Sequence, residues 1–350
     1  TNHKNDMTHA LVTGATGFIG HHLVELRASR GQQVSCLVRR DSDRGGIEGA
    51  DPNYCIGDVT DLASLRRALH GIDVVYHLAG LTKSLRADDL MRVNELGTRN
   101  VALACAESTR SPVLVIVSSL AAAGPADSDQ PRRETDLPVP VSVYGRSKLA
   151  GELVAREYAS QVPTTIVRPP IVFGEGDKDG FNLFQGISKL GIHLVPSFRD
   201  YQFSAIHARD LAVALTILAA RGGRIDESDD ASGVYYAADE QTVSYAEFGR
   251  MIGRCLGRPH AWVVRAPGAA VWTLSAFNEL VSQIRGRPHI LNLDKAREAT
   301  AGSWACSPAR LGRDTGFRCE RGLEERINET VDWYVSQGWL QRKQRHLQAS

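Results

Sequence analysis

The sequence lacks any uninterrupted apolar run long enough to cross a bilayer, so no membrane-spanning segment is expected. It also lacks a charge excess, since 41 lysines and arginines are balanced by 40 aspartates and glutamates in 350 residues. This balance gives no reason to expect a nucleic acid or an acidic membrane as a partner. The first residues, TNHKNDMT, have no apolar core and do not resemble a secretory signal. We therefore expect a soluble, cytoplasmic protein.

Clustered metal ligands are missing as well. The eleven histidines form no HxH or HExxH arrangement, so we expect no metal site. The cysteines form no CxxC pair and no zinc-type cluster, and we expect reduced, mostly buried thiols. The six are Cys36, Cys55, Cys105, Cys255, Cys306 and Cys319.

Short apolar runs alternate with helical patterns through the first half of the chain. Strands that are nearly continuous apolar runs and alternate with helices indicate a parallel sheet covered on both faces. The fold class predicted is therefore α/β. The expected strands are 9–14, 33–39, 73–80, 113–119 and 164–174, and the expected helices are 18–31, 62–71, 90–108 and 142–160.

Beyond Gly174 the alternation weakens, and we expect a loop-rich stretch to about residue 203. The apolar-rich segment 266–286 is expected to be a helix that faces the core; the alternatives are a wall of a lipophilic pocket or a contact with a membrane surface. Further helices are expected at 206–222, 244–257 and 322–337, with a charged connector at 221–233.

We interpret the second half as a smaller, discontinuous substrate domain that lies over the sheet. The predicted boundaries are 7–173 plus about 204–237 for the domain that contains the sheet, and about 174–203 plus 238–340 for the smaller domain.

Three glycines, Gly14, Gly17 and Gly20, follow the first expected strand and open the first expected helix. The first glycine allows the turn, and the second lets a pyrophosphate approach the amides at the helix N-terminus. The third lets the helix pack against the strand. The spacing differs by one residue from GxGxxG, and a purely structural loop is the alternative. The context favours dinucleotide binding.

The residues after the next two strands bear on the choice of cofactor. Arg39 and Arg40 end the second expected strand, where arginines suit the 2′-phosphate of NADP. Asp41 and Asp43 lie nearby, so NAD is the alternative cofactor. Asp58, in the stretch CIGDVTD, follows a further apparent strand, where its carboxylate could accept from an adenine amino group. A solvated aspartate is the plainer interpretation.

A tyrosine and a lysine, Tyr144 and Lys148, lie four residues apart and hence on one face of an expected helix. A neighbouring ammonium stabilises a phenolate and makes tyrosine usable as an acid or base towards an alcohol or ketone. Ser119 ends the strand 113–119 at the carboxyl edge of the sheet and could bond the reacting oxygen. Ser118, or an ordinary strand-end serine, is the alternative.

Several motifs follow one another along the chain: TGATGFIG, Asp58, HLAG (77–80), VNELGTRNV (93–101), VSS (117–119), YGRSK (144–148) and RPPIVFG (168–174). In this order they resemble the motifs of the extended short-chain dehydrogenase/reductase family. The resemblance is dense over residues 8–175 and weak beyond them.

The resemblance implies a Rossmann-type doubly wound sheet and a catalytic set of Ser119, Tyr144 and Lys148, with Asn94 holding the site's architecture. It implies that Lys148 bonds the nicotinamide ribose. The cofactor-binding residues it implies are Gly14, Thr16, Gly17, Phe18, Ile19, Gly20, Arg39, Arg40, Asp58, Val59, Leu78, Ala79, Gly80, Tyr144, Lys148, Pro169, Ile171 and Val172.

Two departures from the nucleotide-sugar members of that family bear on the substrate. Ile171 stands where they resemble RYFNVxG and carry an asparagine, and Phe203 stands where they carry an arginine for the diphosphate. Losing a charge-assisted phosphate contact disfavours a diphosphate ligand. We therefore expect an oxidoreductase of the hydroxysteroid-dehydrogenase and dihydroflavonol-reductase kind, acting on a small, fairly apolar alcohol or ketone.

Two alternatives to this function remain from the sequence. The first is a nucleotide-sugar epimerase or dehydratase, and the second is a cofactor-binding regulator without chemistry, which the presence of Ser119, Tyr144 and Lys148 disfavours. For the assembly, the resemblance implies a homodimer through the helices expected at 90–108 and 142–160.

Overall fold

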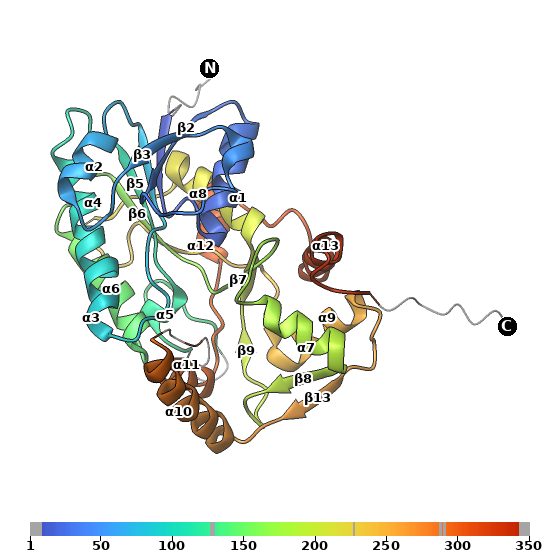
Figure 1. The fold of residues 1–350 in the computed structure, drawn as a ribbon. Helices are drawn as coiled ribbons and strands as arrows, with labels where there is room; N and C mark the ends of the chain where they lie inside the picture. The colour runs from blue at the N-terminus through green and yellow to red at the C-terminus, as the bar shows by residue number, and fades with distance from the viewer. Residues whose placement is uncertain (1–8, 127–129, 227, 287–288, 290–291, 343–350) are drawn as a thin grey trace.

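The computed structural model describes residues 9–126, 130–226, 228–286, 289 and 292–342 (Figure 1). Its centre is a seven-stranded sheet in the order β11-β6-β5-β4-β1-β2-β3, and every strand pairs in parallel with its neighbours. The strands are β1 (His9–Thr13), β2 (Gln33–Val38), β3 (Asn53–Ile56), β4 (Val74–His77), β5 (Val113–Val117), β6 (Thr164–Arg168) and β11 (Val234–Tyr236).

Helices cover both faces of this sheet, which confirms the doubly wound α/β fold. On one face α1 (Phe18–Ser29) and α8 (Ala208–Arg221) bury leucines and valines against the strands. On the other face lie α2 (Leu62–Ala68), α4 (Gly97–Ala106) and α6 (Val143–Arg156). The chain order reverses between β1 and β4, so their carboxyl ends open the crevice where such sheets bind ligands.

The helix expected at 90–108 is interrupted. The structure has α3 (Ala87–Met91), one turn of π-helix η2 (Arg92–Leu96) and then α4. The Thr98 hydroxyl donates to the Asn94 carbonyl at 2.6 Å and competes with the backbone for that acceptor. A π-turn of this kind often marks a functional site, and here it contains Asn94.

The single strand expected at 164–174 is also wrong. It divides into β6 and β7 (Ile171–Phe173), because Pro169 and Pro170 between them have no N–H group to donate to a ladder. β7 then leaves the main sheet and pairs in parallel with β10 (Ala205–His207).

The loop-rich stretch expected up to residue 203 contains regular structure. α7 (Phe181–Leu190) buries Phe184 and Ile187, which lie three residues apart on one helix face, and β8 (Ile192–Val195) follows directly. α7 packs with α9 (Tyr245–Cys255) and α13 (Leu323–Ser336) around a separate apolar cluster, and β8 lies against α7 and α9. The short, glycine-flanked helix hid its periodicity from the sequence pattern.

The helix α10 (Gly268–Arg285) forms where 266–286 predicts a helix, but the expectation that it faces the core is wrong. Its larger apolar side chains point outward, as described below. Among the described residues, no helix is both long and apolar enough to cross a membrane. The remaining elements are η1 (Glu48–Ala50), α5 (Leu120–Ala123), β9 (Gln202–Phe203), β12 (Val243–Ser244), β13 (Trp262–Arg265), α11 (Leu293–Thr300) and α12 (Ala309–Thr315).

Candidate active site

The glycine loop lies between β1 and α1, and its packing requires glycine at two positions. Gly14 has a φ of +72°, and a Cβ there would meet the Ala79 nitrogen at 2.6 Å. A Cβ on Gly20 would meet the Gly14 carbonyl oxygen at 2.2 Å. α1 begins after Gly17 with no side-chain cap and no acidic residue in its first turn. Its free N–H groups and dipole therefore suit an anion at the mouth of the loop, next to Thr16, Phe18 and Ile19.

The residues predicted for the adenosine end lie at the carboxyl ends of β2 and β3. Asp58 accepts two hydrogen bonds from Thr60, at 2.8 Å from its N–H and 2.7 Å from its hydroxyl. Burial alone raises the pKa of Asp58, but these bonds and the nearby charges of Arg39 and Arg92 lower it overall. Arg39 itself is largely exposed, as is Arg40, so both are accessible to a ligand. The sequence did not single out Arg92, which comes from the π-turn.

The floor of the crevice consists of Leu78, Ala79 and Gly80, which follow β4. The Leu78 N–H donates to the Thr13 carbonyl at 3.1 Å, and the Ala79 N–H donates to the Thr13 hydroxyl at 3.2 Å. A Cβ on Gly80 would meet the Asn94 amide oxygen at 2.9 Å and the Lys148 ammonium at 3.5 Å. Gly80 therefore leaves room for both side chains at the centre of the site.

A buried chain of hydrogen bonds passes beneath this floor through His77. The His77 ring lies 2.8 Å from the Thr13 hydroxyl at Nδ1 and 3.0 Å from the Thr98 hydroxyl at Nε2. Burial lowers the pKa of His77 to about 3, so the ring is neutral. Since Thr98 donates onward to the Asn94 carbonyl, it accepts from Nε2, and Nδ1 accepts from Thr13. The chain thus links β1, β4 and the π-turn.

Asn94 holds the two sides of the site together. Its amide oxygen accepts from the Leu81 N–H at 2.8 Å, and its nitrogen donates to the Leu81 carbonyl at 2.9 Å and the Ser147 hydroxyl at 2.8 Å. Ser147 lies on α6 between Tyr144 and Lys148. Val59 lies close by, buried against Gly97 at the start of α4. The structure therefore brings Asn94 to the centre of the predicted catalytic group.

Ser119 and Lys148 meet at the end of β5. Ser119 is the N-cap of α5, and its hydroxyl oxygen accepts from the Ala121 N–H at 3.1 Å. The Lys148 ammonium donates to the Val117 carbonyl at 2.7 Å. Burial lowers the pKa of Lys148 to about 8, against the opposing charge of Glu152. Ser118, the alternative serine, faces the other way and bonds the buried Glu152 carboxylate. Of the two serines, Ser119 therefore fits the predicted bond to the reacting oxygen better than Ser118 does.

The charge that acts on the Tyr144 phenol comes from a residue that the sequence did not suggest. Burial raises the pKa of Tyr144, and the ammonium of Lys295 opposes this most strongly, followed by a hydrogen bond with Ser119. The Lys295 nitrogen lies 5.2 Å from the centre of the Tyr144 ring. Lys295 pairs in turn with Glu298 at 2.6 Å.

The start of α6 is also held by α11. The Asp294 carboxylate accepts from the N–H groups of Val143 and Tyr144 at 2.7 and 3.0 Å. Ser142 caps the same turn by accepting from the Gly145 N–H and donates to Glu298 at 2.6 Å. No motif marks these carboxylates, which are about 150 residues from the helix they complete. The helix-start pattern Asn292-Leu-Asp was the one local signal for α11.

The segment predicted to lie beside the nicotinamide follows β6. The Pro169 carbonyl accepts from the Leu120 N–H at 2.8 Å, which joins this segment to the turn that contains Ser119. Ile171 and Val172 are in β7, and Ile171 is exposed. Phe203 is buried among the rings of Tyr245 and Phe248. It therefore offers neither a charge nor an accessible surface at the position of the diphosphate-binding arginine.

A pocket of about 200 Å³ lies beside the start of α6. Three of its described lining residues are cations, and each is paired with a carboxylate: Lys83 with Asp179, Lys295 with Glu298, and Arg297 with Asp294. The rest of the described lining comes from 82–90 and from Val143, Glu279, Asn292, Leu293 and Asp294.

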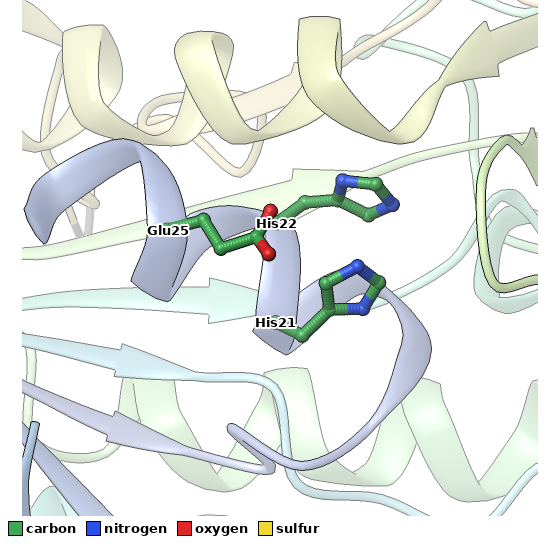
Figure 2. Close-up of side chains that lie close together, drawn as sticks. All are labelled: His21, His22 and Glu25. Atoms are coloured by element: carbon green, nitrogen blue, oxygen red, sulfur yellow. The ribbon is translucent and has the colours of Figure 1, made fainter. Parts of the chain in front are cut away.

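A group of histidines and carboxylates lies on the side of α1 and next to it, just after the glycine loop. The spacing of these residues in the sequence did not predict the group. His21, His22 and Glu25 project from one side of α1 (Figure 2). His22 Nε2 lies 2.9 Å from the Glu175 carbonyl, and burial lowers the pKa of His22 to about 3. The Glu175 carboxylate lies 3.2 Å from His207. The group therefore ties the helix after the glycine loop to the segment after β7.

Comparison with known proteins identifies the family of this chain. Residues 10–230 match the model of the NAD dependent epimerase/dehydratase family. The ceramide reductase of Caulobacter vibrioides is 31% identical over 334 residues, which cover 94% of this chain and 95% of that protein. A vaccinia virus 3 beta-hydroxysteroid dehydrogenase/Delta 5-->4-isomerase is 25% identical, over 80% of this chain and 86% of that protein.

Solved structures agree on the fold. UDP-glucose 4-epimerase from Thermus thermophilus, in complex with NAD, superposes with a TM-score of 0.70 at 22% identity. The match covers 93% of this chain and 99% of the epimerase.

Proposed function

The chain belongs to the NAD-dependent epimerase/dehydratase family of enzymes, and within that family we propose that it interconverts a ketone and a secondary alcohol on an apolar, lipid-like substrate. The observation that carries this proposal concerns Phe203, which stands where nucleotide-sugar members carry an arginine for the diphosphate, and the described cations of the pocket beside α6. Phe203 is buried, and the described cations of the pocket are each paired with a carboxylate. The similarity to a ceramide reductase over nearly the whole chain supports it.

The residues present fit a dinucleotide cofactor. A Cβ at Gly14 or Gly20 would fill the loop, and the uncapped start of α1 offers N–H groups to a diphosphate. Arg39 and Arg40 would hold the 2′-phosphate of NADP, Asp58 the adenine, and Lys148 the nicotinamide ribose. Leu78 to Gly80 and Pro169 to Val172 would line the rest of the site. The bound cofactor supplies or accepts the hydride.

The protein's own groups orient the substrate and move one proton. The Ser119 hydroxyl donates a hydrogen bond to the substrate oxygen, and the Tyr144 hydroxyl transfers its proton to that oxygen during reduction. In the oxidation direction the Tyr144 phenolate takes the proton back. Lys295 stabilises the phenolate across the face of the ring. Asn94 and Asp294 keep α6 in place while the proton moves.

Lys295→Met is expected to shift the pH dependence of alcohol oxidation. Removing the ammonium makes the phenolate less favourable, so the pKa of Tyr144 rises further. Because oxidation needs the phenolate, the acid limb of the kcat/KM profile moves to higher pH. Lys295→Arg, which keeps the charge, should leave the profile close to wild type. Superimposable profiles for the methionine variant and the wild type would remove Lys295 from the mechanism.

Arg39→Ala is expected to weaken NADP⁺ binding by roughly tenfold and to leave NAD⁺ binding unchanged, since only the former loses a charge-assisted bond. Isothermal titration of both cofactors measures this directly. Arg110→Ala, an exposed arginine in the loop before β5, is the matched control. If the wild-type protein prefers NAD⁺, the assignment of NADP is wrong, and Asp41 or Asp43 is the next residue to change.

The proposed reaction is tested by the oxidation of NADPH with three kinds of substrate: ketones of increasing alkyl chain length, a steroid ketone, and UDP-glucose. We expect kcat/KM to rise with chain length, because each methylene that is buried adds apolar contact. We expect the protein not to convert UDP-glucose. Turnover of the UDP-sugar and none of the ketones would instead identify an epimerase or dehydratase.

A further inference from the structure

α10 presents its larger apolar side chains to the solvent and its small ones to the protein. Leu274, Phe277, Leu280 and Ile284 are between 52% and 78% exposed. The buried positions of the same helix are Val271, Ser275 and Ser282. This is the reverse of the pattern of a helix that packs on a core in water. The outward residues therefore need another explanation than core packing.

The short ribbon of β8 and β13 repeats the pattern. Its two parallel strands place Ile192 opposite Trp262 and Leu194 opposite Val264. All four of these side chains are exposed, and Trp262 is 75% exposed. The alternate residues of β8, His193 and Val195, point inward and are buried. One face of the ribbon is thus apolar and open.

The ribbon and α10 are consecutive in the chain and lie at one end of the molecule. Ala266 and Pro267 alone separate β13 from α10, and both elements lie along the lower edge in Figure 1. We define the apolar face as Leu274, Phe277, Leu280 and Ile284 of α10 with Ile192, Leu194, Trp262 and Val264 of the ribbon. Exposed apolar surface gathered in this way marks an interaction site.

The charges around the apolar face distinguish between partners. Among the described residues, the segments 189–200 and 258–286 contain five lysines and arginines and two acidic residues, although the whole chain is nearly neutral. One of the acids, Asp200, pairs with Arg265. A basic border around an apolar centre complements a bilayer surface that carries anionic headgroups. Trp262 and Trp272 have the amphipathic ring that is favoured at the headgroup boundary.

We propose that the apolar face docks the protein on an anionic lipid bilayer, with the outward side of α10 and the ribbon at the boundary between headgroups and acyl chains. The pocket beside α6 is lined by Glu279 of α10, so a docked molecule would hold that pocket next to the membrane. Docking itself needs no enzyme activity. That the membrane supplies the ketone lipid rests on the proposed function.

The test is co-sedimentation of the full chain with vesicles, without cofactor or substrate. Vesicles of equal parts phosphatidylcholine and phosphatidylglycerol should bind it more strongly than vesicles of phosphatidylcholine alone. Raising the ionic strength from ~0.1 M to ~1 M should weaken the binding, because the Debye length falls about threefold. The double variant Phe277→Glu with Leu280→Glu should lose roughly tenfold or more in partitioning. Leu153→Glu, an exposed leucine on α6, is the matched control and should bind as wild type.

Three outcomes would overturn the proposal: no binding to either vesicle, equal binding by the double variant and the wild type, or an oligomer in size-exclusion chromatography that only the double variant dissociates. The last outcome would assign the face to a second copy of the chain. The reduction of a short-chain, water-soluble ketone is measured separately, because it tests the proposed enzyme activity without requiring a membrane. If vesicles bind but no ketone is reduced, the docking proposal stands and the proposed function fails.

Discussion

Replacing Tyr144 by phenylalanine is expected to lower kcat by about 10²–10⁴-fold, the usual contribution of a positioned general acid or base. The substitution removes one oxygen atom and leaves the ring beneath Lys295. It also leaves the two N–H groups that Asp294 holds at the start of α6, so the helix keeps its position. Cofactor affinity should therefore change little.

Single-turnover kinetics with a ketone substrate measure the chemical step, and fluorescence titration with NADPH measures binding. Tyr158→Phe, a partly buried tyrosine just beyond α6, is the matched control and should keep full activity. A Tyr144→Phe enzyme that retains more than about a tenth of wild-type kcat would exclude the phenol as the proton donor. Loss of cofactor binding together with turnover would instead indicate a structural defect.

Glu152→Gln is expected to destabilise the fold by about 3–5 kcal/mol, a large part of the stability of an ordinary domain. The side chains of Glu152 and Arg168 are 1% and 4% exposed, and the pair has contacts of 2.6, 2.9 and 3.2 Å. Glutamine keeps the shape but removes the negative charge. The Arg168 guanidinium is then buried over the Tyr236 ring without its salt-bridge partner.

Chemical denaturation measures this difference, and an exposed pair provides the comparison. Arg66 and Glu107 also form a bidentate pair, at 2.7 and 2.8 Å, but both side chains are in contact with water. Glu107→Gln should therefore cost much less. The combined variant Glu152→Leu with Arg168→Met should recover part of the loss, since no buried charge remains. Equal losses for Glu152→Gln and Glu107→Gln would show that burial adds nothing to the pair.

Local chemistry explains why the geometry of the glycine loop and of α6 could be predicted from the sequence. The turn at Gly14, the helix start at Gly17 and the close packing at Gly20 all depend on residues within a few positions of one another. Tyr144 and Lys148 share a face of one helix for the same reason. The doubly wound sheet followed from the alternation of apolar strands with helices.

Contacts between distant parts of the chain explain what the sequence did not reveal. Asp294 and Lys295 reach Tyr144 only through the packing of α11 on α6, and no spacing rule relates them. The role of His77 depends on hydroxyls from two other elements. For α10, the pattern indicated an apolar side but did not say whether protein or solvent would meet it.

The carboxylate of Asp294 makes the N-terminus of α6 dependent on the packing of α11. Two N–H groups at the start of α6 are satisfied only while α11 lies against that helix, and Ser142 adds a third link through Glu298. α11 also supplies Lys295, so a shift of α11 would uncap the helix and take the ammonium from the phenol in one movement. The proton transfer proposed for Tyr144 therefore depends on the packing of α11 against α6 as well as on Tyr144 itself.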